Sequence, residues 1–214
     1  MITEVKKNIW KLTFKLFGST VYLVKLRGKN ILIDTSSFVN RIELKHLLKE
    51  LDLKPEEIDV VLLTHNHFDH TGNVKIFKNA KVYGSKLDFE KKILNRAFSK
   101  DLPKNKLKSF VGEKFEEVFA NQFESEEDRK VEGILPLEKF DMKEFEIIGV
   151  PGHTKGSVVF FMPKEKVLFS GDHIFDNGYI GRTDLPNSLP EKMKGSLEKM
   201  KKIDYKILCA GHTY

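Results

Sequence analysis

One seven-residue stretch restricts what this chain can fold into more than any other. Residues 64–70 read Thr-His-Asn-His-Phe-Asp-His, so three histidines and an aspartate fall within six residues. They follow a largely apolar run, residues 58–63, whose composition is typical of a buried strand. In an extended chain, residues two apart point to the same side. His65 and His67 can therefore reach the same ion at a strand end.

The two donors that come next in the motif lie where the chain must turn. Asp69 and His70 can face a second ion beside the first. Imidazole and carboxylate groups suit zinc, and the same donors can bind iron or manganese. A polar turn that is rich in histidine by chance is the alternative, but four donors in a His-x-His-x-Asp-His pattern argue against it. The stretch predicts a metal site.

The remaining candidate donors also follow predicted strands. His153 lies between glycines in the sequence PGHTKGS, Asp172 ends the sequence SGD with a carboxylate that could bridge two cations, and His212 follows the last predicted strand. Loops after strands gather at one edge of a layered fold and often carry function. His173, next to Asp172, is a candidate substrate contact or a hydrogen-bond donor to one of the metal ligands. Six of the seven histidines thus occupy strand-exit loops, and only His46 does not.

Asp34 ends another predicted strand and allows two interpretations. It can serve a turn or a helix cap, as aspartate often does after a strand. It can also accept a hydrogen bond from a histidine that binds metal, which would orient the imidazole ring.

The length favours a single domain, residues 1–214. Patterns typical of strands occur before and after residues 86–132, which differ in character. Asn40-x-x-Glu43 resembles a capping box and precedes leucines at helical spacing. Residues 86–132 carry two amphipathic helical patterns and are predicted to form a helical insert. The insert either packs on the surface through its phenylalanines or caps the metal cleft, lending substrate an apolar wall and basic groups.

Composition narrows the choice of partners and location. The formal net charge is +6, but the excess is lysine scattered along the chain, with only five arginines. We therefore expect a solvated surface that favours a small anionic substrate, and nucleic acid is not favoured. No apolar run approaches the ~20 residues of a membrane span, and residues 1–7 lack the apolar stretch of a signal peptide. The single cysteine, Cys209, fits a reducing cytoplasm.

The order of these motifs resembles that of the metallo-β-lactamase-fold superfamily over nearly the whole chain. Residues 151–154 (PGHT) and 181–186 (GRTDLP) look most like the glyoxalase II group, the hydroxyacylglutathione hydrolases. The resemblance implies an α/β fold, a four-layer αββα sandwich, with a dinuclear site at one edge of its two sheets.

The resemblance also implies a role for each donor. The first metal would be held by three imidazoles, the second by two imidazoles and a carboxylate, and one carboxylate would bridge the pair. These are, in turn, His65, His67 and His153; Asp69, His70 and His212; and Asp172. We assign Asp69 and Asp172 as catalytic through these contacts.

The implied cofactor is two Zn²⁺ ions, with iron or manganese possible, which lower the pKa of a shared water toward neutrality. The implied reaction is hydrolysis of an ester-like or amide-like carbonyl by hydroxide, and a glyoxalase II-like thioesterase is the first choice. The alternatives are a β-lactamase or lactonase, a phosphodiesterase or ribonuclease, and a persulfide dioxygenase with a single iron. Full-length glyoxalase II proteins carry a helical C-terminal domain that helps to grip glutathione, whereas this sequence ends two residues after His212. We therefore expect residues 86–132 to supply the binding surface, which argues against glutathione itself.

Overall fold

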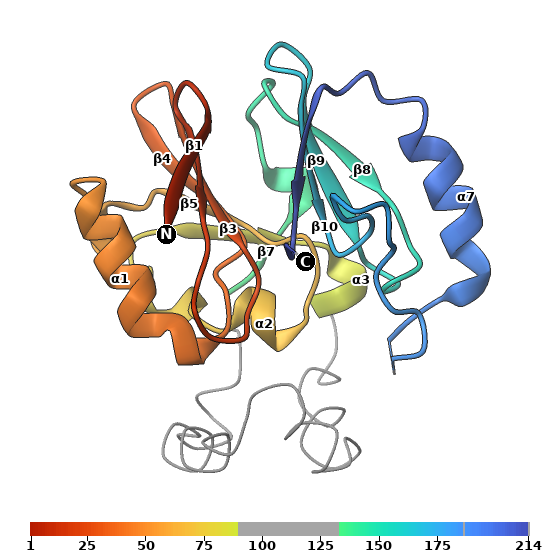
Figure 1. The fold of residues 1–214 in the computed structure, drawn as a ribbon, viewed down its shortest axis with the longest axis horizontal. Coiled ribbons are helices and arrows are strands. Elements are labelled where there is room, and N and C mark those ends of the chain that lie inside the picture. The colour runs from red at the N-terminus through yellow and green to blue at the C-terminus, as the bar shows by residue number, and fades with distance from the viewer. Residues whose placement is uncertain (90–132, 186, 214) are drawn as a thin grey trace.

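The computed structural model describes residues 1–89, 133–185 and 187–213. Two β-sheets face each other, and the two longest described helices cover their outer faces (Figure 1). Most of the predicted insert, residues 90–132, lies outside the described residues, while residues 86–89 form a short helix, α3 (Lys86–Phe89). No helix in the described ranges is long and apolar enough to cross a membrane.

The first sheet has seven strands in sequence order, β1 to β7. The strands β1 to β4 pair antiparallel, and β4 to β7 pair parallel. They are β1 (Ile2–Lys6), β2 (Ile9–Leu12), β3 (Val21–Leu26), β4 (Lys29–Ile33), β5 (Val60–Leu62), β6 (Lys81–Gly84) and β7 (Leu135–Pro136).

The second sheet has the order β11-β10-β9-β8, with β10 and β11 parallel and the other pairs antiparallel. Its strands are β8 (Glu146–Gly149), β9 (Val158–Met162), β10 (Val167–Gly171) and β11 (Ile207–Ala210). The helices are α1 (Arg41–Glu50), α2 (Phe68–Thr71), α3 and α7 (Pro190–Met200), with 3₁₀ turns η1 (Phe38–Asn40), η2 (Pro55–Glu57), η3 (Val74–Ile76) and η5 (Leu137–Lys139).

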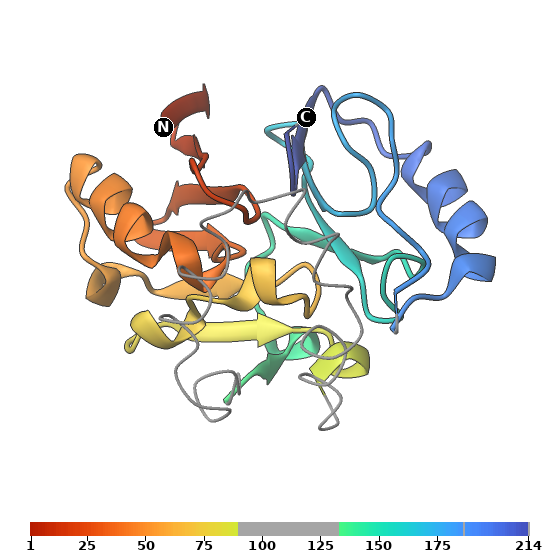
Figure 2. The ribbon, with the colours of Figure 1, turned by 60° about the horizontal axis from the view of Figure 1, so that its bottom comes forward.

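Alternation along the strands creates the layers. Ile31 and Ile33 of β4 belong to the core between the two sheets, whereas Leu32 packs with the leucines of α1 on the other face. A third cluster joins the second sheet to Met200 of α7. Successive side chains of a strand point to opposite faces, so each sheet contributes to two cores. Figure 2 shows α1 and α7 on opposite outer sides. The predicted αββα sandwich is confirmed.

The predicted capping box at the start of α1 is wrong. The Asn40 side chain makes no cap hydrogen bond; its amide donates to the carbonyls of Leu16 and Phe17 and to Ser36 Oγ. Asn40 therefore holds the loop that precedes β3, which adjoins the site described next. Glu43 accepts instead from the backbone N–H of Lys15.

The topology brings five strand ends to one edge of the sandwich. β4 and β5 run parallel in the first sheet, and the pairings of the second sheet make β8, β10 and β11 run in the same direction as one another. Backbone hydrogen bonds join the two sheets there, from Val158 N to Thr64 O and from Thr20 N to Gly211 O. Loops that leave these strands therefore converge.

Candidate metal centre

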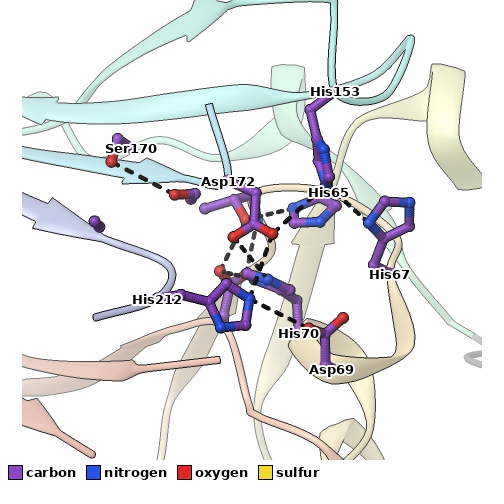
Figure 3. Close-up of polar contacts among 12 residues, drawn as sticks. His65, His67, Asp69, His70, His153, Ser170, Asp172 and His212 are labelled. Carbon is purple, nitrogen blue, oxygen red and sulfur yellow. Dashed lines mark hydrogen bonds and ion pairs between the residues drawn. The ribbon is translucent and has the colours of Figure 1, made fainter. Parts of the chain in front are cut away.

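The seven predicted ligands converge at this shared edge, although they come from loops far apart in the sequence. Figure 3 shows their side chains directed at a common centre. Among the described residues they form three overlapping groups whose ligand atoms lie within 4.8 Å of one another. The groups are His65, His67 and His153; His65, His70 and Asp172; and Asp69, His70 and His212.

The first of these, the three-imidazole group, is built from the extended end of β5 and the loop after β8. His67 Nδ1 lies 2.9 Å from His153 Nε2. Two imidazole nitrogens bound tetrahedrally to one zinc would stand about 3.3 Å apart. The ring of His65 lies 4.6 Å from that of His67 and 4.8 Å from that of His153, centroid to centroid. Three nitrogens are thus placed as ligands of one ion.

The third, the mixed group, begins where the chain turns into α2, directly after the extended residue His67. Asp69 and His70 lie on this single turn, as the motif predicted. His212 Nε2, from the loop after β11, lies 3.2 Å from Asp69 Oδ2. The group combines two imidazoles with a carboxylate, a ligand set that zinc, iron and manganese accept.

The Asp172 carboxylate lies between these two groups. Its Oδ1 is 3.1 Å from His70 Nε2, and its Oδ2 is 3.3 Å from His212 Nε2 and 3.6 Å from His153 Nε2. One carboxylate therefore contacts imidazoles of both groups. This is the arrangement that a ligand shared by two cations requires.

For three of the five imidazoles, hydrogen bonds behind the ring direct the other nitrogen inward. His70 Nδ1 donates to Asp34 Oδ2 over 2.7 Å, and His153 Nδ1 donates to the Arg182 carbonyl over 2.6 Å. Thr64 Oγ1 donates its proton to Asp34 Oδ2, so it accepts from His65 Nδ1. An imidazole that donates through Nδ1 presents the lone pair of Nε2 to a metal.

The inward atoms fit a cation. His65 Nε2, His70 Nε2 and Asp172 Oδ1 are buried and make no well-aligned hydrogen bond among the described residues, although the last two lie 3.1 Å apart as an ion pair. Buried polar atoms without partners are costly, and metal ligation is one way to satisfy them.

Asp34 therefore accepts a hydrogen bond from His70, a candidate metal-binding histidine. This is the second of the two roles that the sequence allowed for Asp34. Its backbone has φ +58°, a left-handed conformation that aspartate tolerates better than most residues. The carboxylate also accepts from the backbone N–H of Thr64. The sequence did not predict a functional role for Thr64, although it is the first residue of the stretch 64–70.

The electrostatics of the groups differ. Burial and the neighbouring imidazoles lower the pKa of His65 well below its ordinary value, and burial with His153 lowers the pKa of His67 to about 3. Burial opposes charge on His70 and His212 too, but Asp172 outweighs it and raises their pKa values to about 10 and about 11. At pH 7 the first two rings are neutral, whereas a cation that enters the mixed group must displace protons.

The two other histidines lie outside these groups. His173 is buried, with 1% of its surface exposed, and neither ring nitrogen has a hydrogen-bond partner in the described ranges. Burial and then His153 lower its pKa to about 4. His46 is exposed on α1 and lies 3.3 Å from Glu50, as expected of a surface residue.

Gly211 sets the position of the Asp172 carboxylate, and this predicts the effect of Gly211→Ala. A Cβ at residue 211 would lie 2.3 Å from Asp172 Oδ1, against the 3.4 Å of ordinary contact, and 2.8 and 2.9 Å from the backbone carbonyl carbon and oxygen of Gly171. The carboxylate would have to move by about 1 Å, and a displacement of that size costs about 100-fold in activity. We expect fewer bound metal ions per chain and a similar loss in kcat/KM. Gly195→Ala is the control, because its Cβ would meet nothing within 4 Å; equal behaviour of both variants would contradict the prediction.

An αββα sandwich that gathers histidines and carboxylates at one sheet edge defines the class of the protein, a metal-dependent hydrolase. A family model described as the Metallo-beta-lactamase superfamily matches residues 15–212. The chain belongs to this superfamily.

Individual relatives agree with the family. The chain is 33% identical over 170 residues to hydroxyacylglutathione hydrolase GloC of Haemophilus influenzae, covering 77% of this chain and 72% of that protein. It is 32% identical over 174 residues to the probable metallo-hydrolase MJ0296 of Methanocaldococcus jannaschii, covering 81% and 64%. Among solved structures, TTHA1623 in a di-iron-bound form has a TM-score of 0.67 at 24% identity, covering 95% of this chain and 92% of that one. The resemblance to the glyoxalase II group is confirmed at the level of family.

Proposed function

We propose that the protein is a dinuclear metal hydrolase that cleaves thioesters in the manner of glyoxalase II. The observation that carries the proposal is the Asp172 carboxylate, which contacts imidazoles of both the three-imidazole group and the mixed group. The similarity to hydroxyacylglutathione hydrolases supports the thioester over other carbonyl substrates.

The seven converging residues would hold two cations, one in each group, with Asp172 shared. Such a pair supplies an activated water at neutral pH and polarises a carbonyl oxygen. The chain keeps His65, His70 and His153 in the ligating tautomer through Thr64, Asp34 and the Arg182 carbonyl, in that order. Asp69 and Asp172 offset the charge of the cations, and this is the sense in which we propose them as catalytic. Zinc is our first choice of metal, and the di-iron form of a structural neighbour makes iron the second.

The substrate we propose is small and anionic, because the net charge of +6 attracts anions. We propose one domain over residues 1–214, with a helical insert at about residues 86–132. A cytoplasmic location is proposed on the single cysteine, Cys209, which is buried and whose thiol pKa is raised by burial to about 12. Contact of His173 with substrate stays a prediction, and it would require the buried ring to become accessible.

A substrate panel on protein of known metal content tests the proposal. We expect two divalent ions per chain and a thioester hydrolysed with a kcat/KM at least ~10-fold above that of a lactone, a β-lactam or a phosphodiester, a difference of about 1.4 kcal/mol. Removing the metal with a chelator should abolish turnover, and zinc should restore it. Hydrolysis that survives full metal removal would contradict the proposal. A single iron with oxygen uptake would instead support the persulfide dioxygenase.

A further inference from the structure

Asp88, on α3, carries a buried carboxylate that the proposed chemistry does not use. Its side chain accepts three hydrogen bonds from neutral donors: Thr154 Oγ1 at 2.7 Å on Oδ2, and Gly156 N and Asn187 Nδ2, each at 2.9 Å, on Oδ1. A Cβ at residue 156 would lie 2.5 Å from the carboxylate carbon, so glycine permits this close approach. Asp88 itself is 3% exposed.

Two of these partners, Thr154 and Gly156, belong to the loop that carries His153. Thr154 directly follows His153. The backbone carbonyl of Asp88 accepts from Asn66 Nδ2 over 3.0 Å, and Asn66 stands between His65 and His67 on the opposite side of the extended chain. One residue on α3 is thus bonded to both segments that supply these three ligands.

The loop of Asn187 completes the arrangement. Its backbone carbonyl accepts from Lys155 N, and the neighbouring Ser188 Oγ donates to the carbonyl of His153 over 2.7 Å. Within the described part of the chain, these hydrogen bonds of Asp88 go to the segments around the three-imidazole group and not to Asp69, His70 or His212. Asp34 differs, because it bonds His70 directly and His65 through Thr64.

We propose that Asp88 is a positioning residue for the three-imidazole group alone, so that it determines how tightly one of the two cations is held. The proposal rests on the proposed function, since it presumes that both groups bind metal. Outer hydrogen-bond partners of metal ligands typically account for 10–100-fold in metal affinity. Asp88 differs from such partners in holding the backbone of the ligand loops rather than a single ring.

The experiment measures zinc affinity in two variant backgrounds, each of which keeps one of the two metal-binding groups intact. His212→Ala disrupts the mixed group and keeps the three-imidazole group, whereas His67→Ala does the reverse. Zinc affinity is determined by competition with a chromophoric chelator, with and without Asp88→Ala. We expect Asp88→Ala to weaken binding about 10–100-fold in the His212→Ala background and by less than about threefold in the other.

Asp59→Ala is the matched control. Asp59 also accepts hydrogen bonds through its carboxylate, from Lys29 Nζ and Asn30 N, but it precedes β5 at the opposite end of that strand from the site. Its loss should leave both affinities unchanged.

Two further variants separate positioning from folding. In Asp88→Asn the amide oxygen can still accept from Gly156 and Asn187, and its NH₂ can donate to Thr154 Oγ1, whose proton then goes to Ser157 Oγ, 2.8 Å away. We expect this variant to recover most of the affinity. If Asp88→Ala does not fold, Thr154→Val removes only the hydrogen bonds of Thr154 Oγ1, to Asp88 and to Ser157, and should weaken only the three-imidazole position severalfold.

Equal weakening in both backgrounds, or no weakening in the His212→Ala background, would overturn the role of Asp88. If the wild type binds two ions in either of these cases, the proposed function is unaffected. Absence of metal binding by the wild type would overturn both.

Discussion

Replacing Asp172 with alanine is expected to empty both metal positions and to lower kcat/KM about a thousandfold, since metal catalysis is worth several kcal/mol and each ~1.4 kcal/mol is a factor of ten. The carboxylate contacts His70, His153 and His212 together. Its removal leaves the charge of two adjacent cations without an offset between them. Elemental analysis and steady-state kinetics on the same preparation measure the two effects.

Asp172→Asn is the matched variant, because it keeps the volume and removes the charge. The pKa of Asp172 is lowered despite burial, through His70 and His212, so the carboxylate is ionised at any working pH. We expect the amide to retain at most one cation. If Asp172→Ala kept two ions and wild-type turnover, the shared-ligand arrangement would be wrong. His67→Ala should lose only the cation of the three-imidazole group. Comparing it with Asp172→Ala separates the effect of losing an unshared ligand from the effect of losing the shared one.

Asp34→Asn is expected to weaken metal binding about 10–100-fold without unfolding the protein. Asp34 Oδ2 accepts from His70 Nδ1 and Thr64 Oγ1, and Oδ1 accepts from Thr64 N. An asparagine presents only one oxygen, so its NH₂ must face one of these donors. If the NH₂ faces His70, it favours the imidazole tautomer that carries its proton on Nε2. That proton blocks Nε2, the atom that would bind the metal.

Asp34→Ala should destabilise the fold as well, because each buried donor left without an acceptor costs about 1–3 kcal/mol. Asp52→Ala is the control for the backbone, since Asp52 has φ +57° and is exposed on the turn after α1. Thermal unfolding and zinc affinity are measured for all three variants. Asp34→Asn with unchanged zinc affinity, or Asp52→Ala with the same loss as Asp34→Ala, would contradict the role assigned to Asp34.

The sequence predicted the candidate ligands from local patterns, and it predicted the fold class through the resemblance of those motifs to the metallo-β-lactamase-fold superfamily. The spacing of donors within residues 64–70 is visible in the sequence. It predicts an extended segment from His65 to His67 after β5 and a turn at Asp69, and the structure has both. The continuous apolar run Ile31-Leu32-Ile33 in β4 is typical of a strand buried on both faces. The capping box at Asn40 failed because a tertiary contact with the loop before β3 competes for its side chain.

The sequence by itself determined which side chains could bind metal, since imidazole and carboxylate groups at strand ends are visible in one dimension. Only the tertiary structure decided how they are grouped and what holds them. Asp88 lies 22 residues from Asn66 and 66 from Thr154, and nothing local distinguishes it from a solvated aspartate. The physical reason is that ligand identity depends on a residue's own chemistry, whereas orientation depends on hydrogen bonds that exist only after distant loops meet at one sheet edge.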